Sequence, residues 1–155
     1  MRIQDIMTTG VETIEPTATA ETARERMKQA RIHHLVVADG AQVVGVISAR
    51  DLGGPRSRVA LNGQSVSEMM ADSVVHIEPD SSLREAANLM RGRSIGCLPV
   101  MKRGKLVGIL TVTDILDVLG RGLFTPISTS QRPPLRRRVS RNSGKSIKKI
   151  PAGAR

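Results

Sequence analysis

Two short motifs of the form Gly-x-x-Ser/Thr-x-x-Asp contain the side chains of this sequence that are best suited to holding a small ligand. The motifs consist of Gly45, Ser48 and Asp51, and of Gly108, Thr111 and Asp114. Each follows a run of aliphatic residues, so we place the hydroxyl at the junction between a strand and a helix. There the hydroxyl and the free N–H groups of a helix start can hold a phosphate oxygen. The aspartate, one turn later, can accept hydrogen bonds from the 2′- and 3′-hydroxyls of a ribose.

The same motif also has a purely structural interpretation. A Ser or Thr followed three positions later by an acidic residue is a capping box, in which each side chain accepts a hydrogen bond from a backbone N–H at a helix start. For a single motif the capping box is the favoured interpretation. Because the motif occurs twice at equivalent positions, with Gly at the same place before each hydroxyl, the two interpretations carry about equal weight.

Both motifs belong to an internal repeat. Residues 5–52 align without a gap on residues 68–115 when they are shifted by 63 positions. We call these segments the first copy and the second copy. A unit of this length that occurs only twice predicts two half-domains packed about a pseudo-twofold axis, because solenoid units are shorter and more numerous. A cleft on that axis would be lined twice by equivalent residues.

Each copy predicts the order strand, helix, strand, strand, helix, which makes the fold class α/β. Runs rich in Val, Ile and Leu predict the strands. They cover residues 11–14, 35–38 and 43–47 in the first copy and residues 74–77, 98–101 and 106–110 in the second.

Apolar residues spaced three and four apart predict an amphipathic helix in each copy. The helices should cover residues 20–30 and residues 83–90, and the polar residues that directly follow proline, Thr17 and Asp80, are the expected N-caps.

The two copies should end differently. A closing helix is predicted from Val112 to Leu119, whereas the first closing helix should be cut short because Gly53, Gly54 and Pro55 follow Leu52 directly. We therefore expect residues 53–66 to be a linker. The predicted domains are residues 1–60 for the first repeat, 61–122 for the second and 123–155 for a C-terminal tail.

The positive charge of the chain belongs to its C-terminal part. Residues 1–120 contain as many acidic as basic side chains, whereas residues 121–155 contain ten basic side chains and no acidic one. The tail is rich in Pro, Ser, Arg and Lys and shows no apolar periodicity, so we predict that it is disordered in isolation. Two roles stay open for it: a solvated extension, which is slightly favoured, and a sequence-independent contact to nucleic acid.

Catalysis is not expected. The sequence offers no Ser-His-Asp, Cys-His, paired-carboxylate or metal-ligand pattern apart from the ligand motif itself. Cys97 is expected to be a small core residue, since it lies between Gly96 and Leu98 at a strand start. With one cysteine and no apolar run near the roughly 20 residues that span a bilayer, the chain is expected to be cytoplasmic and not to associate with membranes.

The repeat resembles a tandem pair of CBS domains, a family named after cystathionine beta-synthase and also called a Bateman module. The resemblance rests on the order of the elements, on the segments ARIHHLVV (30–37) and RSIGCLPV (93–100), and on the two Gly-x-x-Ser/Thr-x-x-Asp endings. It implies a regulatory homodimer that binds an adenosyl ligand such as AMP, ADP, ATP or S-adenosylmethionine and acts on an unknown effector protein in trans. A ligand-free dimerisation or interaction module is the alternative.

The resemblance also implies roles for individual residues. Ser48 and Thr111 would face phosphate or ribose, and Asp51 and Asp114 would hold the ribose hydroxyls. The adenine would lie between apolar residues and the segments that precede each first strand, which involves Ile32, Ile95, Thr9 and Asp72.

The two ligand clefts implied by the resemblance should differ in charge. His33 occupies a position where similar modules place a phosphate-facing basic residue, and its counterpart in the second copy is Gly96. The cleft with His33 should therefore tolerate more phosphate charge than the cleft near Gly96. A histidine beside a hydrophobic strand is, however, more often a packed or surface residue than a ligand contact.

Overall fold

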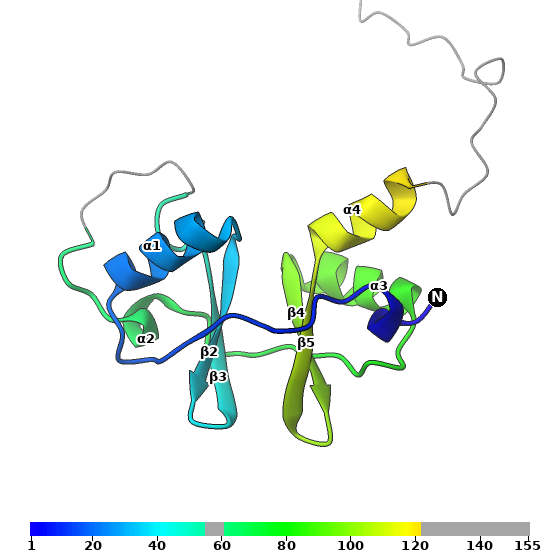
Figure 1. The fold of residues 1–155 in the computed structure, drawn as a ribbon, viewed down its shortest axis with the longest axis horizontal. Coiled ribbons are helices and arrows are strands. Elements are labelled where there is room, and N and C mark those ends of the chain that lie inside the picture. Colours follow the sequence, from blue (N-terminus) through cyan, green and yellow to red (C-terminus); the bar gives the residue numbers. More distant parts are fainter. Residues whose placement is uncertain (55–60, 122–155) are drawn as a thin grey trace, which may run out of the picture. The chain divides into compact units, whose positions relative to one another are not determined.

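The computed structural model describes residues 1–54 and 61–121, and within them each copy contributes one β-hairpin and one long helix (Figure 1). The fold is α/β, as predicted. The hairpins consist of β2 (His34–Asp39) with β3 (Gln42–Ser48), and of β4 (Cys97–Lys102) with β5 (Lys105–Thr111). The predicted tail at residues 123–155 lies outside the described residues, as does part of the predicted linker.

The two copies differ in the strand that precedes each helix. In the first copy β1 (Thr13–Ile14) pairs in parallel with β2, so the sheet order is β1-β2-β3. In the second copy the predicted strand at 74–77 is wrong, because only Ile77 forms a bridge, to Val100. The physical reason is Pro99, the counterpart of Val36, which has no N–H to continue the parallel ladder.

The amphipathic helices are α1 (Ala20–Ala30) and α3 (Leu83–Arg93), each capped by a side chain. The caps are Thr19 and Ser82, whose hydroxyls accept from the N–H groups of Thr22 and Glu85 at 3.2 Å. The predicted caps, Thr17 and Asp80, are therefore wrong by two residues. Proline starts a turn before each helix, closed by bonds from Ala18 N to Glu15 O and from Ser81 N to Glu78 O, both 3.1 Å.

Only the second copy ends in a helix. Helix α4 (Val112–Gly120) forms where the sequence predicts it. After Ser48 the first copy makes only turns, and Gly53 and Gly54 have φ angles of 87° and 98° that do not occur in a right-handed helix. The predicted truncation of the first closing helix is confirmed.

The two copies exchange the segments that precede them. The short helix η1 (Ile3–Asp5) packs on the second copy, where Ile3 is fully buried among Ile77, Met90 and Leu110. The short helix α2 (Val66–Met69) packs on the first copy, where Val66 is fully buried. In Figure 1 the blue N-terminal segment runs from the second copy to the first, and the green segment after α2 runs from the first copy to the second.

The backbone hydrogen bonds of the two crossing segments are equivalent, and their residues are related by the same shift of 63 positions as the sequence repeat. Ile3 N donates to Ser81 O at 3.0 Å, and Val66 N donates to Ala18 O at 2.8 Å. Farther along, Thr8 exchanges two backbone hydrogen bonds with Ile109 (2.9 and 3.0 Å), and Ala71 does the same with Val46 (2.9 and 3.1 Å). The predicted pseudo-twofold relation is thus present in the backbone pairing.

A third apolar cluster joins the copies. Val36 from β2 packs there with Cys97 and Ile109 from the second hairpin. The cluster also includes Val11, Val43, Val46 and Leu106 at its partly buried margin. The two hairpins therefore share a core, and the space above it is enclosed by both copies.

The glycine of each motif has a structural role at these crossings. A Cβ on Gly45 would lie 2.9 Å from the carbonyl oxygen of Ala71, and one on Gly108 would lie 3.1 Å from that of Thr8. Both would also meet the side chain of a crossing methionine, Met70 or Met7. Because the crossing backbone is fixed by hydrogen bonds, it cannot easily withdraw from a new side chain.

We therefore expect Gly45→Ala and Gly108→Ala each to lower the free energy of unfolding by about 1–3 kcal/mol, the usual cost of overpacking. Gly92→Ala is the matched control, because a Cβ at that position of α3 meets nothing within 4 Å. It should raise the free energy of unfolding by up to about 1 kcal/mol, since alanine favours the helix. Urea unfolding of the three variants measures the difference, and equal effects would contradict the packing argument.

Candidate ligand-binding cleft

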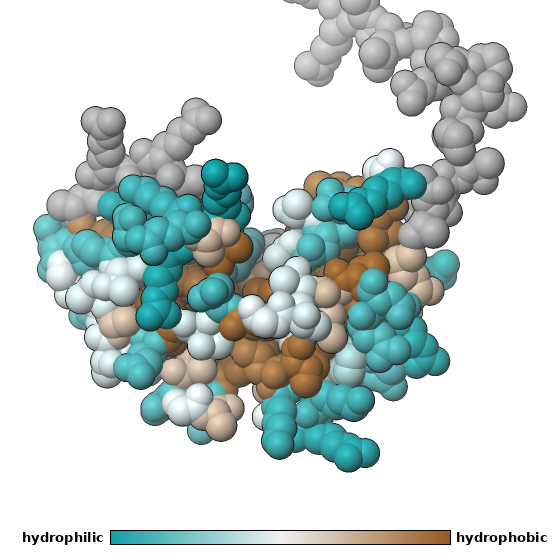
Figure 2. Space-filling model, in the orientation of Figure 1, coloured by the Kyte–Doolittle hydropathy of each residue, from teal (hydrophilic) through white to brown (hydrophobic). Residues whose placement is uncertain are grey.

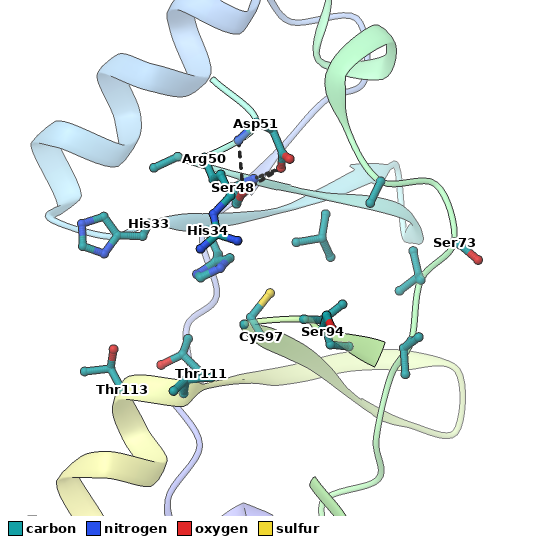
Figure 3. Close-up of a pocket in the computed structure, with 18 residues that line it drawn as sticks. His33, His34, Ser48, Arg50, Asp51, Ser73, Ser94, Cys97, Thr111 and Thr113 are labelled. Carbon is teal, nitrogen blue, oxygen red and sulfur yellow. Dashed lines mark hydrogen bonds between the residues drawn. The ribbon is translucent and has the colours of Figure 1, made fainter. Parts of the chain in front are cut away.

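A cleft of about 660 Å³ lies between the two copies. Figure 2 shows the surface hollowed there, and Figure 3 shows the residues that line it. The lining comes from both hairpins, from the residues just before β2 and β4, from the turns after β3, from the start of α4 and from the segment at residues 71–75 that precedes α3. It includes residues 33–34, 48–51, 73–75, 94–97 and 111–113.

Six of the ten predicted site residues line this one cleft. They are His33, Ser48, Asp51, Ile95, Gly96 and Thr111. The predicted assignment of His33 and Gly96 to separate clefts does not describe the structure. Both residues precede strands of the two facing hairpins, and those strands pack against each other at the pseudo-twofold axis, so the two positions meet in the same space.

Four predicted site residues do not line the cleft. Ile32 lines a second cavity of about 330 Å³, which also contacts Met27 and Lys28 of α1. Thr9 and Asp72 are exposed and line neither cavity. Asp114 is not a lining residue, but its carboxylate accepts a hydrogen bond from the lining residue Thr111.

The capping-box geometry is present in both motifs. The backbone N–H and the hydroxyl of Thr111 both donate to Asp114 Oδ2 at 2.7 Å, and Asp114 N–H donates back to the hydroxyl at 3.3 Å. Ser48 and Asp51 make the same three bonds at the same distances, although no helix follows them. These bonds use only one oxygen of each carboxylate, which has about four lone-pair sites, so both interpretations of the motif stay compatible with the structure.

His34 and Arg50 line the cleft, although the sequence analysis did not select them as site residues. A signal for His34 was available, because pairing β2 with β3 places it opposite Ser48 of the motif. Its ring is half-buried and lies between Ser48 and Cys97 in Figure 3. Nε2 lies 3.2 Å from where a Cβ on Gly96 would be, so the glycine leaves room for the imidazole.

Burial changes the protonation of two groups in the cleft wall. Desolvation lowers the pKa of His34, and the positive charge of the neighbouring His33 lowers it further. Desolvation also raises the pKa of the Cys97 thiol to about 12, helped by the negative charge of Asp51. Cys97 is buried in the cluster between the hairpins, which confirms its predicted place in the core.

The comparison with known proteins identifies the family. The model of the CBS domain matches this chain twice, at residues 3–52 and at residues 66–121. The chain belongs to the CBS domain family. The two matches form a CBS pair, as the sequence resemblance predicted.

Curated relatives of this CBS pair include small and large proteins. The CBS domain-containing protein YhcV of Bacillus subtilis is 32% identical over 114 residues, covering 73% of this chain and 81% of that protein. The magnesium transporter MgtE of Thermus thermophilus is 42% identical over 87 residues, which cover 54% of this chain but only 18% of the transporter.

Solved structures share the fold. A putative acetoin utilization protein (AcuB) from Vibrio cholerae is 30% identical with a TM-score of 0.67, and the alignment covers 78% of this chain and 91% of the AcuB chain. The CBS domain pair of protein MJ0100, solved in complex with 5′-methylthioadenosine and S-adenosyl-L-methionine, is 24% identical with a TM-score of 0.70. That alignment covers 78% of this chain and 97% of the MJ0100 chain.

Two further findings concern only the described part of this CBS pair. None of its helices has the length and apolar character needed to cross a bilayer. Its His, Cys, Asp and Glu side chains form no group of three or more that could hold a metal ion.

The lowered pKa of His34 predicts a loss of stability in acid. In the unfolded chain this histidine binds a proton near pH 6.5, whereas in the folded protein it does so only at lower pH. The contribution of neutral His34 to the free energy of unfolding is therefore present above about pH 6.5 and is lost as the pH falls below it. Urea unfolding between pH 8 and 5 should show a smaller loss for His34→Asn than for the wild type. His76→Asn, at an exposed position outside the cleft, is the control and should follow the wild type.

The raised pKa of Cys97 predicts an unreactive thiol. At pH 8 a thiol with a pKa of about 12 has roughly 10³-fold less thiolate than an ordinary cysteine, and only the thiolate attacks electrophiles. Alkylation by iodoacetamide, followed by mass spectrometry, should be slower by about that factor in the native protein than in the protein unfolded in urea. Equal rates in the two states would show that Cys97 is accessible and ionised.

Proposed function

We propose that this CBS pair is a regulatory module that binds an adenosyl ligand in the cleft between its two copies and acts on a partner protein in trans. The observation that carries the proposal is the shared cleft itself. Its volume of about 660 Å³ lies within the range of small-molecule sites, and hydroxyls from both Gly-x-x-Ser/Thr-x-x-Asp motifs line it.

The lining has the chemistry that a nucleotide requires. Val46, Val74 and Ile95 supply apolar surface against which a base can pack. Arg50 supplies positive charge for phosphate, the His33 and His34 rings supply further hydrogen-bonding nitrogens, and Asp51 is the one carboxylate among the described lining residues. This balance favours AMP, ADP or ATP among the adenosyl ligands.

The relatives support the proposed class of ligand. The CBS pair of MJ0100 was solved with 5′-methylthioadenosine and S-adenosyl-L-methionine, two adenosyl compounds. At 24% identity that likeness establishes the fold, so the ligand class of this chain is our inference from the fold together with the lining. CBS pairs also occur within larger proteins such as MgtE, in which the matched part is a small fraction of the length. A regulatory rather than catalytic role is consistent with both observations.

A ligand in this cleft would touch both copies at once. It can change the arrangement of the copies, or the affinity for a partner, only if it binds one arrangement more tightly than another. Ser48 and Thr111, from the two hairpins, line opposite sides of the motif-lined cleft. A change in the spacing of the hairpins would therefore change the distance between the groups that hold the ligand, and with it the affinity.

A partner surface is available on α4. Val112, Leu116 and Leu119 lie on one face of this helix and are 41%, 58% and 46% exposed. Their spacing of four and three residues makes a continuous apolar stripe. We assign the stripe to protein association, either in the proposed homodimer or with the effector, and a ligand-free interaction module would use the same surface.

Thermal unfolding in the presence of AMP, ADP, ATP, 5′-methylthioadenosine and S-adenosylmethionine tests the proposal. A ligand at 100 times its dissociation constant should stabilise the protein by about 2.7 kcal/mol. Asp114→Ala should abolish this ligand-induced shift because it removes the bonds that fix the cleft-lining Thr111, although the loss of this cap also lowers the starting stability. Asp117→Ala, one turn later on α4 and exposed, removes the same charge and should keep the shift.

The absence of a shift with all five compounds, in a protein that unfolds cooperatively, would contradict the sensor and favour the interaction module. An equal shift in wild type and Asp114→Ala would place the ligand elsewhere.

A further inference from the structure

The second cavity, of about 330 Å³, lies beside α1 where the first copy has turns in place of a closing helix. In the second copy α4 packs against α3, and Ile115 of α4 joins the core there. The counterpart of Ile115 is Leu52, which lines the cavity and is followed directly by the turn at Gly53 and Gly54. The internal repeat therefore shows what kind of element fits this position, namely a helix.

The cavity combines an apolar floor with a basic rim, and we call it the α1 groove. Its apolar lining residues are Met27, Ile32, Ala49 and Leu52. Its basic lining residues are Arg24, Lys28, Arg31 and His33. None of the described lining residues is acidic. A complementary partner would therefore insert apolar side chains and place negative charge at the margin.

The basic rim is a property of the first copy. Three of its four basic residues have neutral counterparts in the second copy, which are Ala87, Ser94 and Gly96. The helix that packs at the equivalent place in the second copy, α4, contains two aspartates and no basic residue. The repeat thus offers an acidic helix as the template for the occupant, and the first copy adds the positive charge that would attract one.

Arg24 also shapes the groove from within. Its guanidinium Nη2 donates to the Leu52 carbonyl at 2.8 Å, which links α1 to the turn on the other side of the groove. This bond holds the turn at the place where a continued helix would otherwise begin. The groove is therefore formed before any partner arrives, which lowers the cost of binding.

Neighbouring segments of this chain lack the charge that the rim requires. Residues 55–60, which follow the turn, contain Arg56 and Arg58 and no acidic residue. The C-terminal residues 121–155 contain no acidic residue either. Negative charge for the rim must therefore come from another molecule.

We propose that the α1 groove is the docking site for an acidic amphipathic helix of the effector protein, which takes the place of the closing helix that the first copy lacks. The inference rests on the proposed action on a partner in trans. A helix that lays its apolar face into a hydrophobic groove is a common mode of recognition. His33 and Ala49 line both the α1 groove and the ligand cleft, so the two sites share side chains through which occupancy of one can change affinity at the other.

The test uses a synthetic peptide of about 18 residues, with leucines spaced three and four apart and glutamates and alanines elsewhere. Its affinity for the full chain is measured by isothermal titration. Lys28→Glu should weaken binding about tenfold, because it replaces attraction at the rim by repulsion. Arg91→Glu is the matched control, since Arg91 is the counterpart of Lys28 and lines neither cavity, and its affinity should stay within about twofold of the wild type.

Two further peptides separate the groove from the basic C-terminal residues 121–155. A peptide with serine in place of leucine keeps its charge and should lose binding, because the groove requires apolar side chains. A peptide with lysine in place of glutamate should bind the double variant Lys28→Glu/Arg31→Glu more tightly than the wild type. Lys28 and Arg31 are exposed, so both variants should unfold cooperatively.

The outcomes distinguish this inference from the adenosyl sensor. Equal weakening by Lys28→Glu and Arg91→Glu, or full binding of the serine peptide, would overturn docking in the groove. Self-association of the protein that Lys28→Glu disrupts would assign the groove to a second copy of this chain and overturn the effector helix. An adenosyl-induced thermal shift without peptide binding would refute the inference alone, whereas peptide binding without that shift would support the groove and contradict the sensor.

Discussion

The structure depends on the reciprocal exchange of the segments that precede the two copies. Ile3 completes the core of the second copy and Val66 completes the core of the first, and both side chains are fully buried. Burying an aliphatic side chain of this size contributes about 1.5–3 kcal/mol, so neither core is complete without residues from the other side. The exchange makes the two copies one folding unit, because separating them would expose both cores.

The exchange also builds the cleft. Residues 8 and 71 continue the crossing segments by pairing with Ile109 and Val46 next to the motif glycines, which holds the hairpins face to face. The ends of the hairpins then lie together, and the hydroxyls of Ser48 and Thr111 line a common space with the Asp51 carboxylate. Gly45 and Gly108 serve this backbone crossing, whereas Ser48 and Thr111, three residues later, line the site. A single motif therefore combines a packing requirement with a chemical one.

The pseudo-twofold symmetry is broken at two places, and each break has a local cause. Gly53 and Gly54 end the first copy in turns, whereas α4 continues the second. Pro99 ends the parallel ladder in the second copy, whereas Val36 extends it in the first. Both breaks lie next to the cleft, so its two sides present different groups to a bound molecule, although the sequence repeat relates them.

The sequence alone determined the repeat, the α/β class, the main helices, both hairpins and the truncated first closing helix, because these follow from local periodicity and from the backbone limits of Gly and Pro. It did not determine the strand at residues 74–77, since the deciding Pro99 is more than twenty residues away and acts only through pairing. Only the tertiary structure placed His33 and Gly96 in one cleft, Ile32 in another cavity and Thr9 and Asp72 outside both. These positions depend on the crossing of the two copies, which no local pattern encodes.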